Sequence, residues 1–174
     1  MSDQSLQMFA QMIGYAQREN KFIVSFPSPF ESEDKILAYT VRSGGVPSKG
    51  MGMVTMHWHG LTVRLPGDHE VAGTFTLTFT IDKKNKTINT IEGWMANTFD
   101  SFSNSRAAIE DVKVPISFKL LGPNLEVIST FVVIGCFPTM RGEIALDRNS
   151  TNTVASLPVT FAYDDVDFEP TGGE

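Results

Sequence analysis

The clearest pattern along the chain is a strict alternation of polar and apolar residues in GTFTLTFTID, residues 73–82. Alternate side chains of an extended strand point to opposite faces of a sheet. Every second residue from Thr74 to Thr80 is a threonine, and every second residue from Phe75 to Ile81 is large and apolar. We therefore predict a strand with one face in the core and the other face polar but uncharged.

Several other runs predict strands separated by turn-rich segments. KFIVSF and ILAYTV lie on either side of PSPFESED, and SGGVPSKGMG, residues 43–52, is predicted to be a loop. MVTMHWH and LTVRL meet at Gly60, which predicts a hairpin with its bend near His59 and Gly60. KVPISFKLLG and LEVISTFVVIG predict a second hairpin around Gly122, Pro123 and Asn124. CFPTMRGEIALD, the turn RNSTNT and the strand VASLPVTFAY follow.

Two segments have the spacing of amphipathic helices, with apolar residues recurring every three or four positions. The first is a short N-terminal helix with the stripe Met8, Phe9, Met12, Ile13 and Ala16. The second is longer and carries Ile88, Ile91, Met95, Phe99 and Phe102. Asp82 or Asn85 is a candidate cap for the second helix. Together with about eight strands, these helices predict an α+β fold dominated by antiparallel sheet.

The return strand of the second predicted hairpin is apolar on both faces. Its two alternating sets are Val127, Phe131 and Val133 on one face and Ile128, Val132 and Ile134 on the other. A strand with one solvated face would leave one set in water. We therefore expect both faces to be covered, by the domain itself or by a neighbouring subunit.

Composition limits the possible organisation and function. A chain of 174 residues suits one domain over residues 1–174, with an N-terminal helical arm at 1–20 and an acidic tail at 164–174 that we expect to be mobile. The net charge is −6 and no run of Lys or Arg occurs, which disfavours tight electrostatic binding of DNA. No long apolar run and no basic leader occurs, so we expect a soluble chain without an export signal or membrane insertion.

All the histidines fall within HWHGLTVRLPGDHE, residues 57–70, which raises the possibility of a metal site. A strand would place His57 and His59 on one face, roughly 7 Å apart. A third ligand would have to come from Asp68, His69 or Glu70. The alternative is that the two histidines occupy the polar side of a hairpin whose apolar side carries Trp58. We favour this alternative and expect neither a metal nor a cofactor.

The remaining reactive residues have simpler structural interpretations. Cys136, the sole cysteine, lies in an apolar context that would raise its pKa, so we expect a buried structural thiol. A strand would place Arg141, Glu143 and Asp147 on the same face. This arrangement favours a surface or interface ion pair over acid–base catalysis. No nucleophile or phosphate-binding motif is present. We therefore expect a protein that is not an enzyme.

The segment GCFPTMRGEIALDRNSTNTVASLPVTFAY, residues 135–163, resembles the C-terminal part of the tail tube proteins of contractile-tailed bacteriophages and related contractile injection systems. The resemblance covers roughly residues 20–163. The matching motif positions are Gly135, Phe137, Pro138, Thr139, Gly142, Glu143, Leu146, Asp147, Asn149 and Ser150.

This resemblance implies a β-sandwich or barrel-like subunit of the virion tail, assembled in the cytoplasm of the bacterial host. Such subunits form hexameric rings, and the rings stack into the inner tube through which DNA is ejected. The implied partners are other copies of the chain, the tail sheath protein, baseplate and tail-terminator proteins, and a tape-measure protein in the lumen. DNA would pass without specific binding. A tube initiator, a phage-derived injection particle and the type VI secretion tube share the same implied fold.

Assembly of this kind would cover the doubly apolar strand, pair the open sheet edges and give the hairpin tip at His57, Trp58, His59 and Gly60 a role between rings. Acidic residues would line a lumen that repels phosphate, and the threonine face at 74–80 is an equally good lining. Two other classes remain as alternatives. One is a metal-dependent, cupin-like β-sandwich enzyme that uses His57, His59 and His69, and the other is a ligand-binding β-module that presents Trp58.

Overall fold

The computed structural model describes residues 20–27, 36–71, 73–100, 105–106, 108–149 and 153–170. Every strand pairing among these residues is antiparallel, which confirms the predicted α+β class with mainly antiparallel sheet. The elements are β1 (Phe22–Ser25), α2 (Ile36–Thr40), β2 (Val41–Gly44), β3 (Lys49–Trp58), β4 (Leu61–Val71), β5 (Thr74–Thr80), α3 (Lys86–Thr98), β6 (Phe99–Asp100), β7 (Ser105–Arg106), α4 (Ile109–Val112), β8 (Val114–Leu121), β9 (Val127–Arg141), β10 (Ser156–Ala162) and β11 (Asp165–Pro170).

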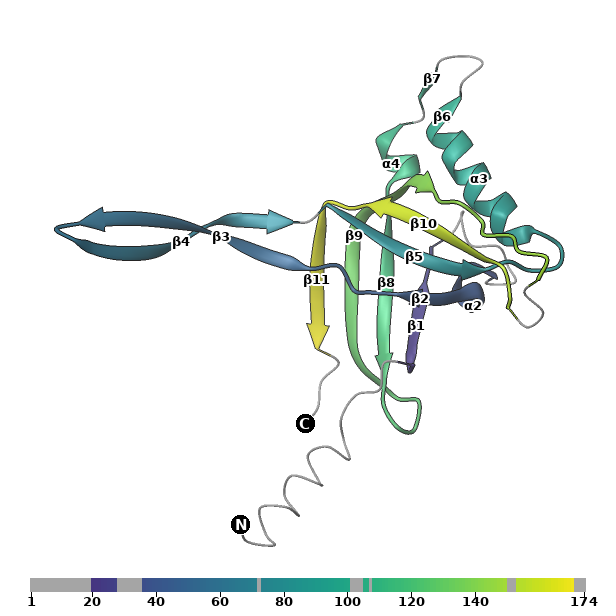
Figure 1. Ribbon diagram of the computed structural model, residues 1–174, viewed down its shortest axis with the longest axis horizontal. Coiled ribbons are helices and arrows are strands. Elements are labelled where there is room, and N and C mark those ends of the chain that lie inside the picture. The colour runs from purple at the N-terminus through teal and green to yellow at the C-terminus, as the bar shows by residue number, and fades with distance from the viewer. Residues whose placement is uncertain are drawn as a thin grey trace, which may run out of the picture.

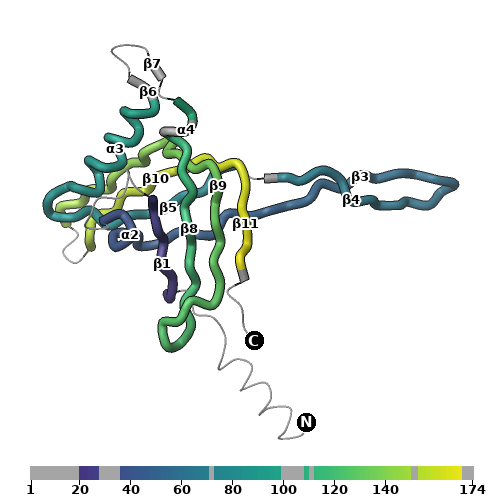
Figure 2. The backbone as a smooth tube through the Cα atoms, turned by 180° about the vertical axis from the view of Figure 1, so that it is seen from behind, coloured from purple at the N-terminus to yellow at the C-terminus, as the bar shows by residue number. Residues whose placement is uncertain are grey.

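Strand β9 belongs to two sheets and joins them (Figure 1). Its first part, Val127–Cys136, pairs with β8, and β11 pairs with the other edge of that part, so the first sheet has the order β1-β8-β9-β11. Its last part, Phe137–Arg141, pairs with β10, so the second sheet has the order β9-β10-β5-β2. The two sheets pack against each other, and β3 and β4 project away from both (Figure 2).

Gly135 marks the place where β9 passes from the first sheet to the second. Its φ is 70°, a conformation that glycine adopts without the steric cost of a side chain. A Cβ atom at this position would collide with the carboxylate of Asp164. The backbone N–H of Asp164 donates to the carbonyl of Ile134 at 2.9 Å, which holds the next turn of the chain against this bend.

The core lies between the two sheets. The burial of alternate residues in β5 confirms the prediction made from residues 73–82. Phe75, Leu77 and Phe79 of β5 are buried, while the threonines point to the other face. Phe75 stacks on Phe161 of β10 at 5.4 Å and meets the edge of Phe118 in the first sheet at 5.8 Å. Aromatic contacts therefore cross the space between the sheets and hold them together.

Helix α3 begins close to the predicted cap. Asp82 Oδ1 accepts a hydrogen bond from the Thr87 backbone N–H at 3.1 Å. Trp94, which the sequence interpretation missed, is almost fully buried, lies 5.8 Å from the Phe161 ring and donates through Nε1 to the Val112 carbonyl at 3.1 Å. The predicted C-terminal end of this helix was wrong, because the helix ends at Thr98 and Phe99, a residue of the predicted stripe, begins β6. Phe102 lies outside the described residues, as does the predicted N-terminal helix.

Two predicted strands and one predicted loop are wrong in part. ILAYTV is not a single strand: Ile36–Thr40 is helix α2, with Leu37 fully buried and the Thr40 hydroxyl donating to the Ile36 carbonyl at 2.8 Å. A short apolar run fits a buried helical turn as well as a strand. Residues 49–52 of the predicted loop already pair within β3, and residues 142–147 of GEIALD lie beyond the end of β9.

The expected mobile tail is instead ordered over most of its length. Asp165–Pro170 form β11, which pairs with β9 from Ile134 to Ser129. Val166 is buried, and the Phe168 ring lies 4.9 Å from Phe131. These two apolar residues alternate with acidic ones, which is the period of two expected of a strand. The high charge of the segment had instead suggested a solvent-exposed tail.

Gly135 provides a test of this sheet corner. We expect Gly135→Ala to lower the free energy of unfolding by about 1–3 kcal/mol, because alanine must adopt positive φ against the Asp164 carboxylate. Gly93→Ala is the matched control: a Cβ at Gly93 meets no atom within 4 Å in helix α3, so that variant should gain about 0.5–1 kcal/mol. Urea unfolding measures both. A Gly135→Ala protein as stable as the wild type would contradict the corner's dependence on glycine.

Candidate functional site

The hairpin of β3 and β4 projects from the two sheets as a long arm (Figure 1). Its strands pair from Lys49 with Val71 to Trp58 with Leu61, and His59 and Gly60 form the two-residue turn. Both turn residues have positive φ, 44° and 80°, as a tight hairpin of this type requires. The predicted bend at His59 and Gly60 is confirmed.

One face of this arm is a continuous apolar surface, which we call the apolar ladder. Residues opposite each other in an antiparallel pair lie on the same face, so the register defines its members. They are the cross-strand pairs Val54 with Leu65, Met56 with Val63, and Trp58 with Leu61. Their exposed fractions run from 43% to 71%. A two-stranded ribbon with so much apolar surface in water needs a further layer to cover it.

The opposite face of the arm is polar toward its tip, whereas nearer the base it carries Met53, which is 62% exposed and lies opposite Pro66. Thr55 lies opposite Arg64, and the Thr62 hydroxyl lies 3.2 Å from Nδ1 of His57. His59 packs edge-on against the ring of Trp58 at 4.9 Å. The arm therefore has one face suited to burial and one suited to water, the pattern of a strand pair that docks on one side.

The three histidines are not brought together. His69 lies opposite Met51 near the base of the arm. Met51 and His57 are six residues apart on β3, which places the two ends of this set roughly 20 Å apart. Among the residues that the structure describes, no group of three His, Cys, Asp or Glu side chains could hold a metal ion. The metal-dependent alternative therefore has no site built from His57, His59 and His69.

The base of the arm is tied to the end of β10 and to β11 by what we call the root contacts. Lys49 Nζ lies 3.2 Å from Asp165 Oδ1 and donates to the Val166 carbonyl at 2.9 Å. The Tyr163 hydroxyl donates to the Ser48 carbonyl at 3.0 Å. His69 Nε2 lies 3.9 Å from the same carboxylate oxygen of Asp165. These contacts connect the first residues of β3 and the last residues of β4 to the C-terminal strand.

Asp165 is stabilised in its charged form at this position. The backbone N–H of Val166, and then Lys49, hold the pKa of the Asp165 carboxyl below its usual range. A carboxylate that accepts hydrogen bonds and faces a cation loses these contacts when it is protonated.

The predicted interface strand is covered on one face only. On the inner face Val133 is fully buried and Phe131 is half-buried against Phe168. On the outer face Ile128 and Ile134 remain 45% and 40% exposed. Ile23 of β1 adds to this exposed outer surface of the first sheet. The subunit thus leaves the second set of apolar residues of β9 partly exposed.

The C-terminal motif forms the junction between β9 and β10. Pro138 is buried, and the Thr139 hydroxyl donates to the Thr160 carbonyl at 3.1 Å. The N–H of Gly142 donates to the Pro158 carbonyl at 2.7 Å, where a larger residue would collide with the proline ring. Phe137 lies under the Lys113 ammonium at 5.9 Å from the ring centre.

Within the described part of the subunit, Arg141 does not form the expected ion pair with Glu143 or Asp147. Arg141 Nε lies 2.5 Å from Glu92 Oε1 of helix α3 instead. The prediction assumed that the strand continues past Arg141, but β9 ends at that residue. Asp147 Oδ1 accepts a hydrogen bond from the Asn149 backbone N–H at 2.9 Å and so shapes a turn.

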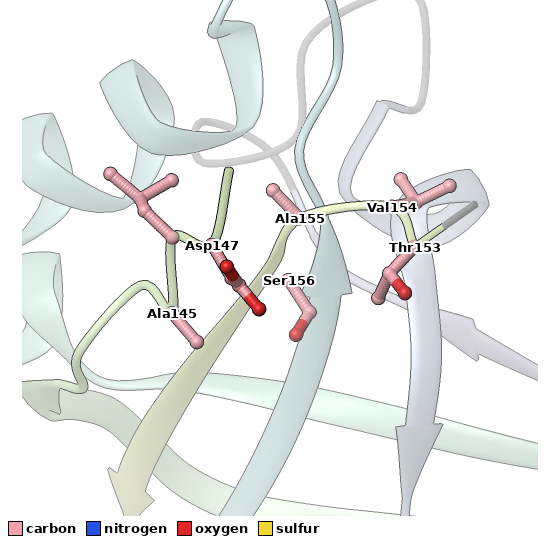
Figure 3. Close-up of a pocket in the computed structure, with 7 residues that line it drawn as sticks. Ala145, Asp147, Thr153, Val154, Ala155 and Ser156 are labelled. Atoms are coloured by element: carbon pink, nitrogen blue, oxygen red, sulfur yellow. The ribbon is translucent and has the colours of Figure 1, made fainter. Parts of the chain in front are cut away.

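An open hollow lies beside this turn (Figure 3). It is lined by Ala145, Leu146, Asp147, Thr153, Val154, Ala155 and Ser156. Asp147 is the only ionisable group in this lining, and its carboxylate already holds the turn. The hollow therefore offers no pair of groups for acid–base or nucleophilic chemistry.

Cys136 is fully buried, as predicted, and its thiol lies 3.2 Å from the Val133 carbonyl. Burial raises the pKa of the Cys136 thiol to about 12. A thiol in this state is not an activated nucleophile at neutral pH.

Within the described residues, no helix is long and apolar enough to cross a membrane.

Sequence comparison relates the chain to a phage protein. No family model matches. The chain is 26% identical over 158 residues to the tail tube protein of Serratia phage KSP90, and the alignment covers 86% of this chain and 87% of that protein. The resemblance to tail tube proteins is confirmed.

Solved structures of contractile injection systems share the fold. The tube terminating cap of the anti-feeding prophage has a TM-score of 0.68 at 19% identity, covering 90% of this chain and 93% of the cap protein. A protein of the PVC sheath-tube complex in the extended state has a TM-score of 0.63 at 18% identity, covering 98% of this chain and 99% of that one. The tail-tube fold therefore extends over nearly the whole chain.

Asp165 tests the root contacts. Its lowered pKa means that its contribution to stability is present above the ordinary carboxyl pKa and is lost as the pH falls through the lowered pKa of the folded state. We expect Asp165→Asn to unfold at lower urea concentration than the wild type at neutral pH, with the difference vanishing in strongly acidic solution. Asp167→Asn, on the same face of β11, is the control. A difference that persists unchanged at low pH would contradict an electrostatic origin.

Proposed function

We propose that this chain is a structural subunit of the inner tube of a contractile phage tail or a related injection particle. Six copies form a ring, and rings stack into a tube within a contractile sheath. The observation that carries this proposal is the apolar ladder, which lies on an arm that projects away from its own core (Figure 2). The relationship to the phage tail tube protein supports it.

The ladder supplies a driving force for assembly. Full burial of a large apolar side chain contributes roughly 1.5–3 kcal/mol. Six such residues, each about half exposed, therefore stabilise a contact by several kcal/mol when a neighbouring copy covers them. Because the arm projects from its own core, the neighbour that covers it is a second copy, and the tip at Trp58, His59 and Gly60 lies at a contact between rings.

Sheet edges and the outer face of the first sheet supply further contacts. In the described part of the chain, β1 and β2 end the path of paired strands, and β11 pairs only with β9. Unpaired edges readily accept a strand from another chain. A head-to-tail contact repeated around a closed ring satisfies these edges in every copy.

The proposed partners follow from the tube assignment. They are other copies of the chain, the sheath protein, baseplate and terminator proteins, and a tape-measure protein in the lumen, with DNA passing through the tube. Similar solved proteins come from a sheath/tube terminator, a sheath-tube complex and a baseplate. The particle is the virion tail, assembled in the host cytoplasm. A tube initiator of the same fold would have the same subunit structure. We assign no catalytic role.

The ladder is tested by a pair of adjacent substitutions on opposite faces of β3. We expect Met56→Glu to fold as a subunit but fail to form rings or tubes, because burying an unpaired carboxylate in an apolar contact costs several kcal/mol. Thr55→Glu, on the polar face, should still assemble. Size-exclusion chromatography and negative-stain microscopy give the readout. Normal tubes from Met56→Glu, or wild-type protein that stays monomeric at high concentration, would rule against the proposal.

Strand β9 is tested by a second pair. Val133→Lys places a charge in the fully buried inner face, so we expect loss of the folded subunit, seen by circular dichroism. Val132→Lys places it on the half-buried outer face, so we expect a folded subunit that assembles poorly. Normal polymerisation of Val132→Lys would show that no neighbour covers this face.

A further inference from the structure

The two central strands of the second sheet contain no charged residue, whereas its flanking strands β2 and β9 carry Arg42 and Arg141. Strands β5 and β10, TFTLTFT and SLPVTFA, contain no Lys, Arg, Asp or Glu, whereas 20% of the whole chain is charged. Their register places Thr76 opposite Thr160 and Thr80 opposite Ser156, while Thr78 faces Pro158 and Thr74 faces Ala162. We call their outer face the hydroxyl face. It comprises Thr74, Thr76, Thr78, Thr80, Ser156 and Thr160 together with Pro158 and Ala162, and on the neighbouring β9 Met140 lies opposite Thr160 and Phe137 opposite Ala162.

The hydroxyls of this face partly satisfy one another. The Thr76 and Thr160 hydroxyl oxygens lie 3.2 Å apart across the two strands. Thr139 donates to the backbone carbonyl of Thr160 at 3.1 Å. Such groups exchange hydrogen bonds with water readily and offer no fixed charge or pocket to a ligand.

This face also differs from the surfaces suited to subunit contact. Among the described residues, no exposed large apolar side chain lies on β5 or β10, although Met140 of β9, which is 58% exposed, lies opposite Thr160; many of the others lie on the arm and on the first sheet. The first sheet also carries the acidic side chains of Asp165, Asp167 and Glu169 on its β11 edge. The hydroxyl face is therefore suited to remain in water when the other surfaces are covered.

We propose that the hydroxyl face lines the channel of the tube, an inference that rests on the proposed function. The molecule that passes is a polymer with a phosphodiester backbone. Lysine or arginine on the wall would pair with phosphates, release counterions and retain the polymer. A wall of hydroxyls provides only weak, interchangeable hydrogen bonds, so the polymer slides. Of the two linings compatible with the sequence, carboxylates and threonines, the threonines lie side by side on the uncharged central strands β5 and β10.

Thiol labelling of assembled tubes tests this placement. Thr76→Cys puts a reactive thiol on the hydroxyl face, while the native Cys136 is fully buried, and the wild-type protein measures its background. Free subunits and long tubes are each treated with a small maleimide and with maleimide-activated albumin, a globular reagent too wide to enter a channel. Thr160→Cys, directly across the strand pair, provides the same measurement at a second position.

We expect both reagents to label free subunits, and only the small maleimide to label long tubes. Labelling of tubes by the albumin reagent would place the hydroxyl face on the outside and overturn the inference. Protection from both reagents in tubes would place it within a subunit contact and overturn it equally. Failure of the wild-type protein to form tubes would instead overturn the proposed function, so the two failures are distinguishable.

Discussion

A two-stranded hairpin that exposes an apolar face to water is the physical constraint that favours assembly of this subunit. The apolar ladder lies outside the core, and its six residues remain half-exposed or more exposed in the isolated subunit. Three or more strands, or a packed layer, are needed for such a ribbon to be independently stable. The apolar surface of the subunit lies in two places, one between its two sheets and one on the arm. Only the surface between the sheets is buried within the chain.

The body of the subunit contacts the arm at its base. Strand β9 joins the two sheets through the bend at Gly135, and β11 returns along its edge. The root contacts of Lys49 and Tyr163 then connect the arm to the end of the chain. The C-terminal strand is therefore part of the support of the arm, and the acidic residues beside it keep that strand soluble at an open edge.

Sequence patterns predicted the parts of the fold in which one local periodicity dominates. The threonine strand at 74–80, the bend at His59 and Gly60 and the burial of Cys136 followed from alternation, turn chemistry and apolar context. ILAYT was misassigned because five residues are too few to distinguish helical from extended spacing. The β11 strand was missed because its charges masked the alternation of Val166 and Phe168. Trp94 had a detectable signal, since it lies three residues after Ile91 on the buried side of α3. The separation of His69 from His57 depends on strand register, which pairing and a bulge determine and composition does not.

Coverage of the apolar ladder by a second copy can be measured with the two tryptophans of the chain. Trp58 is 71% exposed at the tip of the arm, whereas Trp94 is buried in the core whether or not the subunit assembles. Acrylamide quenching of tryptophan fluorescence, before and after tube formation, follows Trp58 against this constant reference. If a second copy covers the ladder, the quenchable fraction disappears and the emission shifts to the blue when tubes form. Tubes in which Trp58 is quenched as readily as in the free subunit would contradict this coverage.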